Sequence, residues 1–439
     1  MTFFPTVKKI EYKGPSSTDP LSFRYYNPDE VLMGKSMKEW LRFSVCFWHT
    51  FVGGGGSDPF GETTLLREWE ENLTGMDLAK RRIDVAFEFF TKLGVEFYTF
   101  HDFDVAPEGS SLEESRANID AISDYLLQKQ TETGVKLLWA TQNLFSNGRY
   151  MHGAMTNPDV HVFCYAAASI QKALDVNHKL GGQNHVFWGG REGYQSLLNT
   201  DIKKECDHMA ALYKMAIQYK QQKGYNMMYL LEPKPREPTR HQYDYDAQTT
   251  MAFLHTYGLT DHFKLNIEPN HTTLAGHDAS HDIKIASQYG VLGSIDSNTG
   301  DPILGWDTDN FPMDVAQSTA IMSTIVDQGG LGSGGLNFDC KVRRESIDPL
   351  DLFLGHIGAM DTYAQGLRAA IQMKEDGIMQ SMLDERYLSW NTESIGSRIE
   401  SGEATLEECV EYALTRGEPK KVSGKQELFE MVRNRYVYK

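Results

Sequence analysis

Eight extended apolar segments recur along the chain, separated by stretches with helical periodicity, and this alternation limits the fold more than any other feature. The segments are residues 43–51, 95–105, 135–145, 183–190, 226–234, 263–271, 290–300 and 334–342. Several are continuous runs of β-branched and aromatic residues, which is typical of strands buried on both faces of a parallel sheet. Eight strand–helix units predict an α/β fold, a (β/α)8 TIM barrel.

The stretches between these segments carry helix start and stop signals. Residues 111–134 begin with Ser111, a residue type that caps helices, and end with Gly134, a residue type that stops them. Residues 202–224 also have a helical pattern and end with Gly224, and beyond about residue 350 the chain is helical and charged without further strand signals. We therefore expect an N-terminal extension (1–42), a barrel catalytic domain (43–350), and a helical part that completes the barrel and forms a C-terminal arm (351–439).

The charge and composition of the chain argue against several classes of binding partner and cellular location. The chain has 43 Lys and Arg against 60 Asp and Glu, and its net charge of -17 repels nucleic acid and anionic lipid surfaces. It contains neither a signal-peptide pattern nor an apolar run of about 18 residues, so export and membrane insertion are not expected. Its five cysteines show no CxxC spacing, which argues against disulfides and a cysteine zinc site. We expect a cytoplasmic protein.

Acidic residues lie at the C-terminal ends of the last four predicted strands, where barrel enzymes place their active sites. They are Glu232, Glu268, Asp296 and Asp339. About 30 to 40 residues separate each from the next, the length of one βαβ unit, so the four carboxylates should meet at one rim. A single acid is more often a helix cap or a surface ion pair. Four consecutive strand ends that carry acids instead favour metal binding.

Prolines restrict the backbone at two of these strand ends. Glu232 and Glu268 each precede a proline, and a residue before proline is pushed from the helical toward the extended region. Lys234 also precedes a proline. Because residues i and i+2 of an extended chain share a face, Glu232 and Lys234 should point to the same side.

Further candidate ligands follow the strand ends: His271 in "EPNH", and Asp307 and Asp309 in "GWDTDNFP". Taken alone, His271 is also compatible with a hydrogen-bonded core histidine. Six gathered carboxylates with Lys234 and a neutral imidazole would carry a net charge of about -5, which is too costly at low dielectric without counterions. Two divalent cations would offset most of it. Mainly oxygen ligands favour Mg²⁺, with Mn²⁺ or Co²⁺ as alternatives.

The glycine run at 53–56 does not indicate nucleotide binding. It lacks the Lys-Ser/Thr of a phosphate-binding loop, and no GxGxxG opens a helix nearby. A βα loop at the catalytic rim explains this run better.

Long motifs of the chain resemble the xylose isomerase family. They are "FHDFDV", "WGGREGY", "LEPKP", "NIEPNHTTLAGH", "GSIDSNTGDPILGWDTDNFP" and "GGLNFDCKVRR". The resemblance covers nearly the whole chain, and the long part before "CFWHTF" is similar to the longer, class II type. It implies isomerisation of D-xylose to D-xylulose, and of D-glucose to D-fructose more weakly, by a metal-assisted 1,2-hydride shift on the open-chain sugar. It also implies a homotetramer built as a dimer of dimers.

The resemblance also implies roles for individual residues. The first metal ion would be held by Glu232, Glu268, Asp296 and Asp339, and the second by Glu268, His271, Asp307 and Asp309. His101 and Asp104 would bind the ring oxygen and assist ring opening, and Lys234 would bind the sugar O1. The pocket would be lined by Trp48, Thr141, Phe145 and Trp188, and Phe60 would close the site of a neighbouring subunit.

Other interpretations remain from the residues alone. By position, an i, i+3 pair such as His101 and Asp104 is more often a structural hydrogen bond than a catalytic pair. Phe60 and the tryptophans could be core aromatics. Paired metals also serve hydrolases and endonucleases, although the acidic net charge and the single candidate histidine ligand argue against these. A non-catalytic barrel that keeps metals for stability would not need Lys234 and His101.

Overall fold

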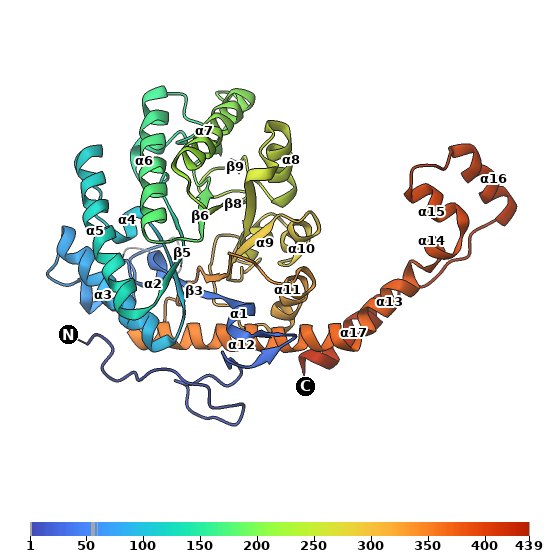
Figure 1. The fold of residues 1–439 in the computed structure, drawn as a ribbon, viewed down its shortest axis with the longest axis horizontal. Helices are drawn as coiled ribbons and strands as arrows, with labels where there is room; N and C mark the ends of the chain where they lie inside the picture. Colours follow the sequence, from blue (N-terminus) through green and yellow to red (C-terminus); the bar gives the residue numbers. More distant parts are fainter. Residues whose placement is uncertain (1, 54–57, 59, 439) are drawn as a thin grey trace.

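The computed structural model describes residues 2–53, 58 and 60–438, and within them eight parallel strands close into a barrel (Figure 1). The strands are β3 (Phe43–Cys46), β4 (Phe97–His101), β5 (Lys136–Thr141), β6 (Asn184–Trp188), β8 (Met228–Glu232), β10 (Phe263–Ile267), β11 (Leu292–Asp296) and β12 (Leu336–Phe338). Each pairs in parallel with the next, and β12 pairs with β3 to close the ring. The predicted (β/α)8 barrel is confirmed.

Helices surround the barrel on its outer side (Figure 1). They are α3 (Gly75–Leu93), α5 (Leu112–Thr133), α6 (Val160–Lys179), α7 (Ile202–Lys223), α8 (Ala247–Tyr257), α10 (His281–Gln288), α11 (Val315–Gln328) and α12 (Pro349–Asp376). The predicted caps of α5 are present: the Ser111 hydroxyl accepts a hydrogen bond from Glu114 N, and Gly134 adopts φ +78°. That positive φ suits glycine and ends the helix.

All eight strands are shorter than the segments predicted from the sequence, and after three of them the chain turns into short helices at the rim. These helices are α2 (Phe47–Thr50), α4 (Asp102–Val105) and α9 (Pro269–Leu274). Pro269 is the first residue of α9, where its fixed φ favours a helix start and its missing N–H costs nothing. Asp104 and His271 therefore lie on single helical turns rather than on strands.

The core has an inner and an outer part. A small cluster contains residues of the neighbouring strands β4, β5, β6 and β8, with Phe97, Val186 and Leu230 among them. The larger cluster contains the residues between these, such as Tyr98 and Phe187. Since successive strand residues face opposite sides of a sheet, the first fills the barrel and the second lies under the helices.

The segments outside the barrel differ in how closely they pack. The N-terminal segment includes β1 (Val31–Leu32), β2 (Lys35–Ser36) and α1 (Met37–Leu41). It is attached to α12, because the Asp361 carboxylate accepts three backbone N–H bonds of 2.8 Å from residues 24–26.

After α12 the chain leaves the barrel as an arm (Figure 1). The arm contains α13 (Ile378–Arg386), α14 (Leu388–Thr392), α15 (Ser394–Glu400), α16 (Leu406–Arg416) and α17 (Gln426–Val437). Its last helix, α17, returns to pack against α11 and α12. Across the described residues, no helix combines the length and the apolar character needed to cross a membrane.

Candidate metal centre and active site

A cavity of about 300 Å³ lies at the C-terminal ends of the barrel strands. Thirteen of the fifteen residues predicted from the sequence line it: Trp48, His101, Thr141, Phe145, Trp188, Glu232, Lys234, Glu268, His271, Asp296, Asp307, Asp309 and Asp339. The barrel therefore brings together side chains that are up to about 290 residues apart in sequence. The two that do not line it are Asp104 and Phe60.

Three groups of candidate metal ligands share Glu268. They are Glu268–Asp296–Asp339, Glu268–Asp307–Asp309 and Glu232–Glu268–His271, and the ligand atoms within each group lie within 4.8 Å of one another. Glu268 therefore lies close to candidate ligands of both predicted ions. The ligand assignments themselves remain predictions.

The strand ends aim these carboxylates as the sequence indicated. Glu232 and Asp296 are the last residues of β8 and β11, while Glu268 and Asp339 come directly after β10 and β12. Glu268 has an extended backbone (φ -107°, ψ 119°), as the following proline requires. Lys234 and Glu232 both face the cavity.

Burial keeps part of this cluster in its protonated form. It raises the pKa values of Glu232 and Glu268 well above their usual range, and neighbouring carboxylates raise them further. Burial and Asp339 raise the pKa of Asp296 to about 7. In the absence of cations, protons must therefore compensate for the close carboxylates.

Basic groups have the opposite effect on the loop aspartates. Burial alone would raise the pKa of Asp307, but Lys234, with Nζ 2.6 Å from Oδ2, and His271 outweigh it and hold the pKa well below its usual range. Asp307 is therefore anionic, and its charge stabilises the ammonium of the buried Lys234.

The donor set fits hard divalent cations. Oε2 of Glu268 is buried and accepts no hydrogen bond from the described residues, although Nε2 of His271 lies 3.1 Å from it. A buried carboxylate oxygen without a donor is costly unless a cation contacts it. Carboxylate oxygens with one imidazole are ligands that Mg²⁺, Mn²⁺ and Co²⁺ accept.

An aromatic wall faces the acidic cluster. The ring of Trp48 lies 4.6 Å from that of His101, and the ring of Phe145 lies 4.6 Å from that of Trp188. Lys234 Nζ lies 5.3 Å from the centre of the Trp188 ring. Thr141 uses its hydroxyl to bond the Val186 carbonyl, so it contributes mainly its methyl group to the cavity wall.

Asp104 does not line the cavity but contacts His101, which does. Its Oδ2 lies 3.0 Å from His101 Nδ1 and also accepts the His101 backbone N–H at 2.7 Å. Burial lowers the pKa of His101, but Asp104 outweighs this effect and the pKa is raised.

Known proteins identify the family to which this geometry belongs. Xylose isomerase of Rhodopirellula baltica is 52% identical, and the match covers 100% of this chain and 99% of the relative. The chain belongs to the xylose isomerase family. The Hordeum vulgare enzyme of the same name is 52% identical over 98% of this chain and 89% of its own length. The Geobacillus kaustophilus enzyme is 51% identical over 100% and 98%, respectively.

Other comparisons add less to the assignment. Residues 383–437, most of the arm, match the XylA2 C-terminal domain family. Among solved structures, D-psicose 3-epimerase of Clostridium cellulolyticum H10 gives a TM-score of 0.49 at 15% identity, over 74% of this chain and 99% of that one, which is too low to add to the argument. None of these relatives supports the hydrolase or endonuclease alternative.

The sequence analysis missed the amides that hold the carboxylates of this xylose isomerase family member. Asn266 Nδ2 donates to Glu232 at 2.9 Å, and Asn337 Nδ2 donates to Asp296 at 2.8 Å. Asn298 donates to Glu268 at 2.7 Å and to Asp309 at 3.1 Å. The sequence contained a signal for these amides. Each asparagine lies two residues from a predicted ligand (Glu268, Asp339 and Asp296, respectively), and in an extended chain it faces the same side as that ligand.

Two basic side chains at the metal centre were also missed, His49 and Lys341. His49 Nε2 lies 3.1 Å from Asp309 and 3.0 Å from Asp339, and Lys341 Nζ lies 2.7 Å from Asp309. Burial and Lys341 lower the pKa of His49, but both aspartates raise it, and the net shift is upward. Lys341, two residues after Asp339, could have been found by the same i+2 rule.

Phe60 does not line the cavity of its own chain. It is 70% exposed, and its ring lies 6.2 Å from that of Trp306, a cavity residue that the sequence analysis did not select. Its predicted role toward a neighbouring subunit remains a prediction. The glycines at 54–56 lie outside the described residues.

Proposed function

We propose that this chain isomerises D-xylose to D-xylulose, and D-glucose to D-fructose more weakly, by moving a hydrogen between C1 and C2 of the open-chain sugar. The observation that carries the proposal is a single cavity that combines three acidic groups around Glu268, the buried ammonium of Lys234 and an aromatic wall. Xylose isomerases at about 50% identity over the full chain support the choice of substrate.

Two divalent cations would complete the site, with Mg²⁺ preferred and Mn²⁺ or Co²⁺ as alternatives. The first would be held by Glu232, Glu268, Asp296 and Asp339, and the second by Glu268, His271, Asp307 and Asp309. When bound, the cations supply Lewis acidity that polarises the sugar oxygens.

Lys234 is the fixed donor to O1. Its Nζ is held by Asp307 at 2.6 Å and is almost fully buried, so its position requires little reorganisation. A donor already aimed at an oxygen on which negative charge develops stabilises the transition state more than the ground state. The remaining ammonium protons of Lys234 are available to the sugar.

His101 provides the proton-handling group for ring opening. Because Asp104 holds Nδ1–H, the Nε2 atom is left to face the ring oxygen of the cyclic sugar. Asp104 also stabilises the imidazolium, which allows Nε2 to donate and recover a proton. Asp104 is therefore a positioning residue for His101.

The aromatic side chains keep water away from the reacting carbons. Trp48, Phe145 and Trp188 cover one side of the cavity with apolar surface. A hydrogen that moves as hydride between adjacent carbons would be lost to an acidic water molecule, so exclusion of water protects the transfer.

Incubation with xylose and Mg²⁺, followed by an assay for xylulose, tests the proposal. Lys234→Ala should keep its bound cations but lose turnover by about 10²- to 10³-fold, since one aligned donor is removed. Lys284→Ala, on the exposed face of α10, is the matched control and should retain full turnover. Metal-loaded wild-type protein that forms no ketose would contradict the function, and unchanged turnover in Lys234→Ala would contradict the O1 role.

We also propose a cytoplasmic homotetramer arranged as a dimer of dimers. Exposed apolar side chains on α16, namely Leu406, Val410 and Leu414, support a partner surface on the arm, as does the exposed Phe60. Sedimentation equilibrium of the purified protein measures the mass, and a monomer would contradict this assembly.

A further inference from the structure

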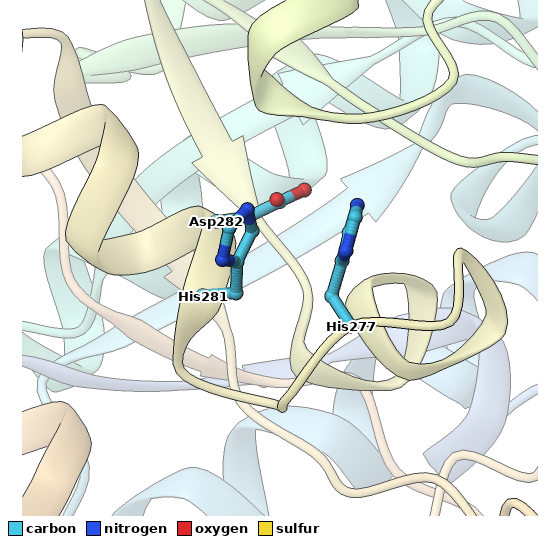
Figure 2. A group of neighbouring side chains, drawn as sticks. All are labelled: His277, His281 and Asp282. Atoms are coloured by element: carbon cyan, nitrogen blue, oxygen red, sulfur yellow. The ribbon is translucent and has the colours of Figure 1, made fainter.

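A second group of metal-ligand side chains lies outside the active-site cavity. His277, His281 and Asp282 each offer one ligand atom, and these atoms lie within 4.8 Å of one another (Figure 2). His277 is in the loop after α9, and His281 and Asp282 are the first two residues of α10. None of the three lines the cavity.

Asp282 gives independent evidence for a ligand at this place. It is only 3% exposed, and its Oδ2 accepts the Ala247 backbone N–H at 3.0 Å. Its Oδ1 is buried and accepts no hydrogen bond from any described residue. Figure 2 shows the carboxylate reaching toward the ring of His277, with the ring of His281 beside it. A buried carboxylate oxygen without a hydrogen-bond donor is costly unless a cation contacts it, and this one belongs to a side chain grouped with two imidazoles.

The two imidazoles lie next to each other, and a second carboxylate holds one of them. The two rings stack with their centres 4.4 Å apart and 27° between their planes, which brings both to one side of the α10 start. Nε2 of His277 lies 3.2 Å from Oδ2 of Asp246, whose Oδ1 caps α8 through the Thr249 N–H. A carboxylate that holds the second nitrogen of a histidine fixes the orientation of the ring, and this pairing accompanies most histidine ligands of metals.

We propose that His277, His281 and Asp282 bind one transition-metal ion, Zn²⁺, Co²⁺ or Ni²⁺, with Asp246 as the orienting carboxylate. Two imidazoles and one carboxylate suit these ions, whereas Mg²⁺ favours sites in which most of the ligands are oxygen atoms. Three protein ligands leave a fourth position for water.

The ion would connect three segments of the rim. It joins the start of α10 directly to the loop after α9, the helix that carries His271, and through Asp246 it reaches the start of α8. We therefore assign it a structural role, which does not depend on the proposed isomerase function.

Zinc binding by the full-length protein tests this site. The protein is saturated with Mg²⁺ and dialysed against Zn²⁺, and bound zinc per chain is then counted by elemental analysis. Wild type is compared with His281→Ala and Asp282→Asn, and His255→Ala, an exposed histidine on α8, is the control. Wild type and control should bind one more zinc ion per chain than either variant. Zinc that enters the active site does not affect this difference, because the active-site ligands are the same in all four proteins.

Equal zinc binding in wild type and both variants would overturn the proposal. Because a variant could fail to fold, wild-type crystals soaked in Zn²⁺ provide a second measurement at the zinc absorption edge. An anomalous peak between His277, His281 and Asp282 is the expected result. No peak there, at a zinc concentration that saturates the dialysed wild type, would also overturn it. Neither measurement uses turnover, so either result is independent of the test of isomerase function.

Discussion

Removal of divalent ions should make the stability of this protein fall as the pH rises toward neutrality. Burial raises the pKa values of Glu232 and Glu268, and that of Asp296 from its ordinary 3.8 to about 7. At low pH these groups are neutral in the folded and the unfolded chain. Above their ordinary pKa values the unfolded chain releases the protons freely, whereas the folded chain retains them. The unfolded state is therefore favoured progressively until the pH reaches the folded pKa.

The magnitude for Asp296 alone is large. A pKa raised from 3.8 to about 7 corresponds to about 4 kcal/mol of stability, lost between those two pH values. His49 and His101 act in the same direction, because their raised pKa values give a stabilisation that is present below 6.5 and is lost as the pH rises through the folded values.

The loop aspartates act in the opposite direction, but in a more acidic range. The pKa values of Asp307 and Asp309 are lowered, so their stabilisation is present above the ordinary 3.8 and is lost only as the pH falls through the folded values. Above about pH 5 their contribution is therefore constant, and the decline caused by the other groups determines the slope.

Denaturant titration after chelation, repeated across this pH range, measures the free energy of unfolding. Asp296→Asn is the matched variant, because asparagine carries no charge at any pH. Without ions the variant should be more stable than wild type above about pH 7, and with saturating Mg²⁺ the order should reverse because a ligand is missing. Ion-free wild-type protein that is more stable at about pH 8 than at about pH 5 would refute the reasoning.

Two further substitutions test the residues that support the site. Asn298→Ala removes the amide that donates to Glu268 and Asp309. The affinity for Mg²⁺, measured by titration, should fall by about 10- to 100-fold. An unchanged affinity would show that this amide does not hold the ligands. Asp104→Asn removes the charge that raises the pKa of His101, so the limb of the kcat/KM pH profile that reports His101 should move to lower pH. A profile identical to that of wild type would show that Asp104 has only a structural role.

Much of the fold was predictable because its signals are local. The apolar runs located all eight barrel strands, and Ser111 and Gly134 located the ends of α5. The predicted ends of the strands were wrong, because every predicted segment is longer than its strand. After three strands the turn into α2, α4 or α9 depends on contacts at the rim as well as on strand propensity.

The candidate site was predictable only as a set of residues. Acids at successive strand ends, and prolines that keep Glu232 and Glu268 extended, follow from the order of residues along the chain, since parallel strands place their ends on one rim. Barrel closure decides which atoms then come into contact. It places His49 and Lys341 in contact with Asp309. It also decides which carboxylates accept a hydrogen bond from an asparagine amide. These contacts and burial together set the pKa of each acid, such as Asp296. Those distances join separate strands and loops, and no pattern within one segment encodes them.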